Sequence, residues 1–224
     1  IDIPIYGSEM SSRAIGMSCI IAMAKTAEQW NTFVGTGEGN YFKELIPYDN
    51  HIITQVATGL FGLKEETIQR VKIVELKYAQ GANFSLSPVY SVHSMEDHKK
   101  QIDWIKQINP NALISVKISS SNDLDMIAMG CYFAGAHIIH LDAGYNENNF
   151  ASEISKKNMA MPIEYAILKV HKFLQDEGIR DKITLIASGI RTADDMIKAI
   201  CLGADGVSIG TAELIALECV HCGN

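Results

Sequence analysis

The feature that most constrains the fold of this chain is a regular alternation of short β-branched runs with amphipathic stretches. The clearest runs, which predict β-strands, occupy residues 112–118, 137–142, 182–188 and 206–210, and weaker ones occupy 3–6, 31–34, 52–56 and 73–78. Eight such runs in 224 residues give about 28 residues per unit, which accommodates a strand, a helix and two loops. The pattern therefore predicts a repeated β–α unit.

The stretches between these runs have helical periodicity. Between residues 162 and 177, apolar side chains recur at helical spacing, and Gly178 follows as a natural stop. Residues 193–202 predict another helix, with Thr192 as its N-cap. Further helices are predicted over residues 12–27, 96–108 and 123–134. No linker interrupts the pattern, so we expect one domain over residues 1–224.

Nearly continuous apolar strands that alternate with helices predict a parallel sheet covered on both faces. Such a sheet either closes into a barrel or stays open and doubly wound. Eight units favour the closed (β/α)8 barrel of the α/β class, in which functional residues lie at the C-terminal ends of the strands. The abrupt start at Ile1 and end at Asn224 lead us to expect a fragment of a longer chain.

Composition excludes several classes of protein. Apolar residues make up 47% and charged residues 20%, which excludes global disorder. A net charge of −7 argues against a nucleic-acid partner, and the apolar runs are too short and too often interrupted to predict a membrane span. Five scattered cysteines do not form a disulfide framework, which favours a reducing, cytoplasmic location.

Two glycine turns follow the last two predicted strands, at Ser188-Gly189 and at Gly210-Thr211. Glycine lets the backbone approach a ligand, and the following helices direct free N–H groups at an anion. In (β/α)8 barrels the loops after strands seven and eight often bind phosphate. We therefore predict a phosphate site here; the alternative is two ordinary turns that require glycine.

Charged and amide side chains stand near the ends of other predicted strands. A buried Lys117 needs a partner, either the N1/O2 edge of a reduced flavin or a barrel carboxylate such as Asp142. Lys77 and Gln80, three residues apart, can converge on one small ligand. Glu38, in a glycine-rich loop, is either a site carboxylate or a solvated charge.

The chain ends with a CxxC motif, Cys219-Val-His-Cys222. Two thiolates at this spacing can share an iron or a zinc, but the metal needs two more ligands. The alternative is a pair of cysteines on a terminal helix.

Several motifs occur in one order along the chain. They include Met10-Ser11, Gly37-Glu-Gly39, Lys77-Tyr-Ala-Gln80-Gly-Ala and the tail Gly-Thr-Ala-Glu-Leu-Ile-Ala-Leu-Glu-Cys that begins at Gly210. This order resembles the FMN-binding synthase domain of glutamate synthase, particularly its stand-alone archaeal type. The resemblance covers nearly the whole chain, and the last two motifs are its most specific parts.

The resemblance implies a flavin-bearing TIM barrel, an oxidoreductase acting on the CH–NH2 group. Such an enzyme reduces 2-iminoglutarate, formed from 2-oxoglutarate and ammonia, to L-glutamate. FMN supplies the hydride, and an iron–sulfur cluster reduces the flavin again. The glutamine-hydrolysing domain has no counterpart in this chain, so ammonia is free or comes from a glutaminase partner. A ferredoxin or an NAD(P)H reductase is the implied electron-donating partner.

The resemblance also assigns roles to matching residues. For the cofactor it implies FMN-phosphate binding by Ser188, Gly189, Gly210 and Thr211, and flavin contacts by Lys117, Met10, Ser11 and Gln80. For the substrate it implies Lys77 and Gln80 as ligands of the 2-oxo acid, with Glu38 lining the same cavity. Cys219 matches the first cluster cysteine of the family, and Cys222 is a second candidate ligand.

The chain departs from the family pattern at the predicted active-site loops. Asn83 stands where the family has lysine, and the arginine-bearing segment before Ser87-Pro88 has no counterpart. Either the sequence omits loop segments, or the barrel is degenerate with weakened catalysis. Two alternative functions stay open. One is another FMN- or phosphate-binding barrel enzyme, similar to isopentenyl-diphosphate isomerase or IMP dehydrogenase; the other is a flavin-binding module without catalysis.

Overall fold

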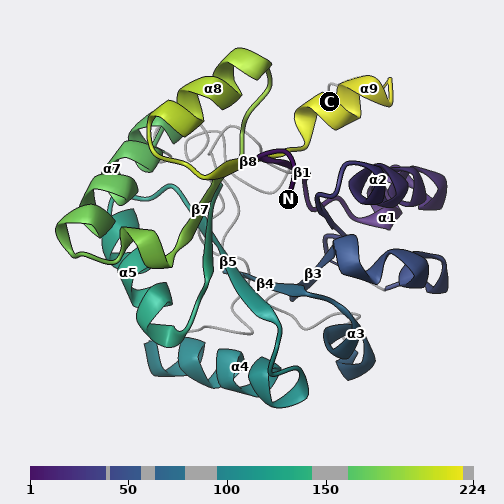
Figure 1. The fold of residues 1–224 in the computed structure, drawn as a ribbon, viewed down its shortest axis with the longest axis horizontal. Coiled ribbons are helices and arrows are strands. Elements are labelled where there is room, and N and C mark those ends of the chain that lie inside the picture. Colours follow the sequence, from purple (N-terminus) through teal and green to yellow (C-terminus); the bar gives the residue numbers. More distant parts are fainter. Residues whose placement is uncertain (39–40, 57–63, 79–94, 143–160, 219–224) are drawn as a thin grey trace, which may run out of the picture.

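A computed structural model describes residues 1–224 apart from 39–40, 57–63, 79–94, 143–160 and 219–224. In the described part, eight parallel strands close into a barrel in the order β1 to β8, with helices around the outside (Figure 1). The structure confirms the predicted (β/α)8 barrel and excludes the open doubly wound sheet. None of the described helices has the length and hydrophobicity needed to span a bilayer.

All eight predicted strands are present. They are β1 (Ile5–Gly7), β2 (Val34–Gly35), β3 (Ile52–Val56), β4 (Ile73–Lys77), β5 (Leu113–Ser119), β6 (Ile138–Asp142), β7 (Thr184–Ala187) and β8 (Gly206–Ile209). The prediction for β2 was displaced toward the N-terminus, because the turn out of the preceding helix takes up residues 31–33. Asn31 adopts a left-handed φ of 44°, and the Thr32 N–H donates to the carbonyl of Ala27 at 2.8 Å.

The helices follow the predicted periodicity closely. The α-helices are α1 (Ser12–Ile15), α2 (Met17–Gln29), α3 (Glu65–Arg70), α4 (Met95–Ile108), α5 (Leu124–Ala134), α7 (Ile163–Asp176), α8 (Ala193–Cys201) and α9 (Thr211–Ala216), and short 3-10 helices cover η1 (Lys43–His51) and η2 (Arg180–Lys182). The single helix predicted over 12–27 is wrong: Gly16 divides it, with a φ of 83° that other residues rarely adopt. As predicted, the Thr192 hydroxyl caps α8, accepting from the Asp195 N–H at 3.2 Å.

The main core lies between the barrel wall and the surrounding helices. Strand residues such as Ile139 and Leu141 face outward and are fully buried, and Ile167 and Leu174 of α7 belong to the same cluster. Alternate residues of a strand point to opposite faces, so the remaining strand positions line the barrel interior. One set of strand residues thus holds the helices, while the other set defines the interior.

The interior is not apolar throughout, which corrects the expectation of nearly continuous apolar strands. A small cluster of Tyr6, Ile53, Ile73 and Ile186 contributes to the interior. Other buried strand positions and the residues at the strand ends are polar: Gln55, Glu75, Lys77, Ser115, Lys117, His140, Asp142, Ser188 and Ser208. Their alternation with apolar residues follows from a barrel whose outer face packs on helices and whose inner face carries polar groups.

Truncating the outward face of β6 tests the packing of this barrel. Ile139 has no exposed surface, so Ile139→Ala should lower the free energy of unfolding by about 2–5 kcal/mol in urea denaturation. Ile139→Val removes one methyl group and should cost about 0.5–1.5 kcal/mol. Equal stability of wild type and Ile139→Ala would contradict the described packing.

Candidate functional site

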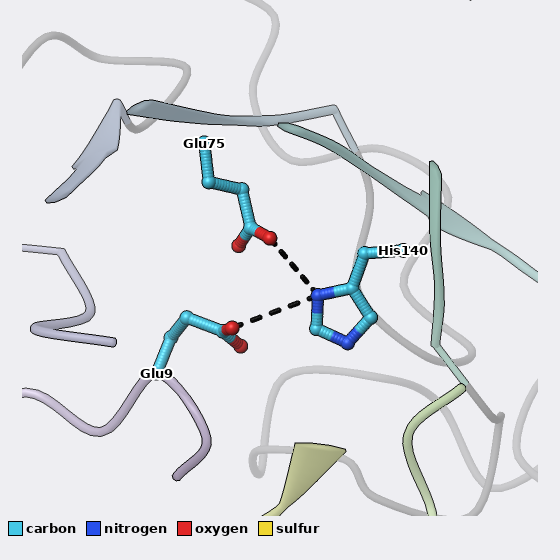
Figure 2. A group of neighbouring side chains, drawn as sticks. All are labelled: Glu9, Glu75 and His140. Atoms are coloured by element: carbon cyan, nitrogen blue, oxygen red, sulfur yellow. Dashed lines mark hydrogen bonds and ion pairs between the residues drawn. The ribbon is translucent and has the colours of Figure 1, made fainter. Parts of the chain in front are cut away.

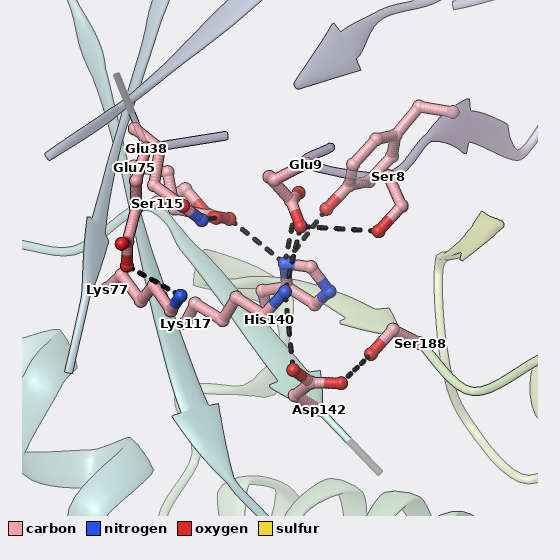
Figure 3. A network of polar contacts seen from close by, with 12 residues as sticks. Ser8, Glu9, Glu38, Glu75, Lys77, Ser115, Lys117, His140, Asp142 and Ser188 are labelled. Atoms are coloured by element: carbon pink, nitrogen blue, oxygen red, sulfur yellow. Dashed lines mark hydrogen bonds and ion pairs between the residues drawn. The ribbon is translucent and has the colours of Figure 1, made fainter. Parts of the chain in front are cut away.

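A buried ion cluster occupies the barrel near the C-terminal ends of its strands (Figure 3). Nζ of Lys117, on β5, lies 2.8 Å from Oε2 of Glu9 and 3.3 Å from Oδ2 of Asp142. The Lys117 side chain is 5% exposed, and both carboxylates are less exposed still. Ser188 Oγ donates to the second oxygen of Asp142 at 2.6 Å. The cluster joins β5, β6, the end of β7 and the loop after β1.

A second set of polar contacts adjoins this cluster and centres on His140. Its Nδ1 lies 2.9 Å from Oε2 of Glu75 and 3.1 Å from Oη of Tyr6. Glu75 is held in place by Gln55 Nε2 at 2.8 Å and by Ser115 Oγ at 3.0 Å. Both Glu75 and His140 are fully buried. Side chains from five strands therefore fix one carboxylate and one imidazole inside the barrel.

The two sets meet at Glu9, whose Oε1 lies 3.6 Å from His140 Nδ1 (Figure 2). One ligand atom each from Glu9, Glu75 and His140 lies within 4.8 Å of the others. Among the described residues, this is the group whose spacing suits a cation. Lys117 already balances part of the carboxylate charge there, through its contact with Glu9.

The contacts set the protonation of these groups. Burial alone lowers the pKa of Lys117, but the charges of Asp142 and Glu9 outweigh it and raise that pKa above its usual value. In the same way, burial opposes protonation of His140, while Glu9 and Glu75 raise its pKa. Burial raises the pKa of Glu75, but the charge and hydrogen bond of His140 produce a net lowering. The contacts therefore favour the charged forms of Lys117, His140 and Glu75.

A second lysine–carboxylate pair lies at the adjacent strand end. Nζ of Lys77, on β4, is 2.6 Å from Oε1 of Glu38, and Lys77 is buried whereas Glu38 is 41% exposed. Lys77 and Lys117 are direct partners in the register of β4 and β5. Two ammonium groups thus come from neighbouring strands, and Glu38 and Glu9 reach them from the loops after β2 and β1.

The loops that carry these carboxylates pack directly on one another. Gly37 has a left-handed φ of 63°, and a Cβ there would lie 2.7 Å from the backbone nitrogen of Ser11. Met10 and Ser11 follow Glu9 in the loop after β1. Their predicted place beside the strand ends therefore agrees with the structure, and their contact with a flavin stays a prediction.

The Ser188-Gly189 turn lies at the end of β7. Gly189 has a φ of 89°, which favours glycine. The Ser188 hydroxyl is buried against Asp142, so the backbone of this turn is better placed than the hydroxyl to meet an anion. The polar lining of an adjacent cavity of about 240 Å³ contains both basic and acidic side chains: Arg191, Lys198, Glu164 and Asp195, beside Gly189.

The Gly210-Thr211 turn lies at the end of the adjacent strand, since β7 and β8 pair at Ala187 and Val207. A Cβ at Gly210 would lie 3.0 Å from Cβ of Ser8, which gives this glycine a packing reason independent of any ligand. Thr211 begins α9. The two turns are therefore neighbours, as the prediction of a phosphate site requires, although no contact of the structure tests that role.

The structure thus places most predicted site residues at one end of the barrel. Gln80, Cys219 and Cys222 lie outside the described residues. Glu9, Glu75 and His140 are site residues that were not predicted from the sequence. A signal for two of them was present, because Glu75 and His140 each stand two residues before another polar residue in an otherwise apolar strand.

Fold and site define a (β/α)8 barrel whose interior carries charged side chains near the C-terminal strand ends. The conserved region of glutamate synthase matches residues 1–86 and 83–224. The chain therefore belongs to the glutamate synthase family.

Individual relatives support this assignment. The chain is 34% identical to archaeal glutamate synthase (NADPH) of Methanocaldococcus jannaschii, a match that covers 100% of this chain and 50% of the relative. It is 33% identical to the archaeal-type enzyme of Thermotoga maritima, over 99% of this chain and 50% of the relative. It is 31% identical to ferredoxin-dependent glutamate synthase of Pyropia yezoensis, over 75% of this chain and 13% of the relative. The chain thus spans about half the length of its archaeal-type relatives.

The fold also resembles a solved structure of more distant sequence. Inosine 5′-monophosphate dehydrogenase from Legionella pneumophila aligns with a TM-score of 0.59 over 93% of this chain and 58% of that chain, at 17% identity. At this identity the likeness supports the barrel fold alone.

The pKa of His140 predicts a pH dependence of stability. Because that pKa is raised in the folded protein, its stabilising contribution is complete below the unfolded value of about 6.5 and is lost as the pH rises through the folded value. The stability advantage of wild type over His140→Gln should therefore shrink when urea denaturation is repeated from about pH 6 to about pH 9.

A second group also titrates in this range, because burial raises the pKa of the Glu213 carboxyl to about 8. Its titration falls in the same pH window and lowers stability in the same direction, but it is common to wild type and His140→Gln. Parallel stability curves for these two proteins would show that His140 is not charged in the folded state.

Proposed function

We propose that this barrel binds FMN and carries out the glutamate-forming step of glutamate synthase, the reduction of 2-iminoglutarate to L-glutamate. The observation that carries the proposal is the pair of buried ammonium groups of Lys77 and Lys117 on neighbouring strands. Each is balanced by the carboxylate of a loop residue, so each can exchange that partner for an anionic or electron-rich group of a ligand. Membership of the glutamate synthase family supports the proposal.

The described residues fit FMN. Lys117 supplies a buried cation for the pyrimidine edge of the flavin ring. His140 Nε2, on β6, is buried without a hydrogen-bond partner among the described residues, which leaves a polar atom inside the barrel. Bound FMN would supply hydride transfer, while the protein supplies orientation and charge.

The phosphate end of FMN has its own candidate residues. The backbone of Ser188 and Gly189 and that of Gly210 and Thr211 lie at adjacent strand ends. Arg191 lines the cavity beside Gly189 and adds positive charge. We assign the FMN phosphate to these turns.

Lys77 is the proposed ligand of a carboxylate of the 2-oxo acid. Its present partner, Glu38, is 41% exposed and can return to solvent when a substrate carboxylate takes its place on Lys77. Gln80, the second proposed substrate ligand, lies outside the described residues. A dicarboxylate substrate suits this strand end because its charge replaces that of Glu38 on Lys77.

The remaining parts of the proposal rest on the family. They are an iron–sulfur cluster with Cys219 and Cys222 as ligands, ammonia from solution or from a glutaminase, electrons from a ferredoxin or an NAD(P)H reductase, and a cytoplasmic location.

A flavin-binding module without catalysis is the second candidate. The match to the Methanocaldococcus jannaschii relative extends over 253 positions, more than the 224 residues of this chain, so the relative has segments that this chain lacks. Missing loop segments at the strand ends would remove substrate contacts while leaving the barrel intact.

The proposed function is tested by reoxidation of reduced flavin. The chain, loaded with FMN and reduced without oxygen, should return to the oxidised absorbance spectrum when 2-oxoglutarate and ammonium are added, with formation of L-glutamate. Lys77→Met should slow this reoxidation by about a hundredfold or more, because it removes a charge-assisted contact to the substrate.

Lys99→Met is the matched control, since Lys99 lies on the exposed face of α4. It should react like wild type. Flavin binding without reoxidation in any of the proteins would favour the non-catalytic module, and equal rates for wild type and Lys77→Met would contradict the role of Lys77.

A further inference from the structure

Glu9 is a carboxylate of a loop residue that is buried inside the barrel. It follows β1, yet its side chain is only 1% exposed (Figure 3). Its Oε2 contacts Lys117 at 2.8 Å, while its Oε1 has no hydrogen-bond partner among the described residues. A loop carboxylate in solution would be hydrated on both oxygens, so its burial needs a specific cause.

The end of β2 makes room for this side chain. A Cβ on Gly35 would lie 2.5 Å from Cγ of Glu9 and 2.9 Å from its Cα. Any other residue at position 35 would therefore push Glu9 away from Lys117. Glycine at this position and the charge of Lys117 together explain why Glu9 enters the barrel.

Glu9 is one of two carboxylates that compete with a ligand for the three donors of the Lys117 ammonium group. Lys117 contacts two carboxylates, Glu9 at 2.8 Å and Asp142 at 3.3 Å. Asp142 is part of β6 and is fixed by Ser188, so it stays in place when a ligand enters. Glu9 belongs to a loop, and its contacts other than Lys117 are longer: Ser8 Oγ lies 3.5 Å from its Oε2, and His140 Nδ1 lies 3.6 Å from its Oε1. A ligand that takes the shorter of the two carboxylate contacts of Lys117 therefore replaces Glu9.

We propose that Glu9 is an internal competitor of the flavin at Lys117, and that the loop after β1 must withdraw it before the flavin ring can bind. The inference rests on the proposed function, because it takes FMN as the ligand of Lys117. The affinity for FMN is then the intrinsic affinity multiplied by the fraction of molecules in which Glu9 has left. Glu9 thereby determines how readily the barrel accepts its cofactor.

The test is a titration of the flavin-free chain with FMN, in which the quenching of flavin fluorescence measures binding. Glu9→Gln and Glu9→Ala remove the competing charge and should bind FMN at least about tenfold more tightly than wild type. Gly35→Ala keeps every charge but displaces Glu9, and it should also tighten binding. Glu65→Gln, on the exposed surface of α3, is the matched control and should change the dissociation constant by less than about twofold.

The outcomes separate this inference from the proposed function. Tighter binding by the Glu9 variants and by Gly35→Ala supports the inference, most strongly if wild type binds too weakly to measure. If wild type binds FMN while folded Glu9 variants bind equally or more weakly, the inference is wrong and the proposed function stands. If no folded variant binds FMN, the proposed function fails and the inference fails with it. Circular dichroism of each variant establishes that it is folded, and Gly35→Ala decides the matter if the Glu9 variants are not.

Discussion

The charge of Lys117 inside the barrel is the constraint on which the site depends. An ammonium group buried without partners is prohibitively costly, so its presence on β5 requires carboxylates within contact distance. Asp142 comes from the adjacent strand and Glu9 from the loop after β1. These contacts join segments far apart in the sequence, and they hold that loop over the interior. The polar groups around His140 extend the same network across β1, β3, β4 and β5.

The barrel separates stability from chemistry by the alternation of its strands. Outward positions such as Ile139 and Leu141 pack on helices and supply hydrophobic stabilisation. Inward positions carry acids, bases and lysines that add little to stability, because desolvation offsets much of their attraction. Burying such groups costs free energy. They are concentrated at the C-terminal strand ends, where enzymes of this fold bind ligands. Membership of the glutamate synthase family and this electrostatic arrangement both support the proposed ligand site at these strand ends.

Much of the fold was predictable from periodicity, because hydrophobic spacing depends only on local sequence. The eight strands and the Thr192 cap of α8 were found in this way, whereas Gly16 divided a helix that periodicity alone had joined. The site was less predictable. For Lys117, a carboxylate partner at Asp142 was foreseen as one of two alternatives, but Glu9 was not, because burial of a loop residue depends on barrel closure and on glycine at a distant position.

The most direct test of the central claim is the ionisation of Lys117 in the folded protein. Its ¹³Cε resonance, assigned by its loss in Lys117→Arg, reports the charge of the ammonium group as the pH is raised. With Glu9 and Asp142 as partners, the group should remain charged beyond about pH 10.4, where an ordinary lysine is half deprotonated. A titration midpoint at or below that pH would show that burial prevails over the carboxylates, and would contradict the described ion cluster.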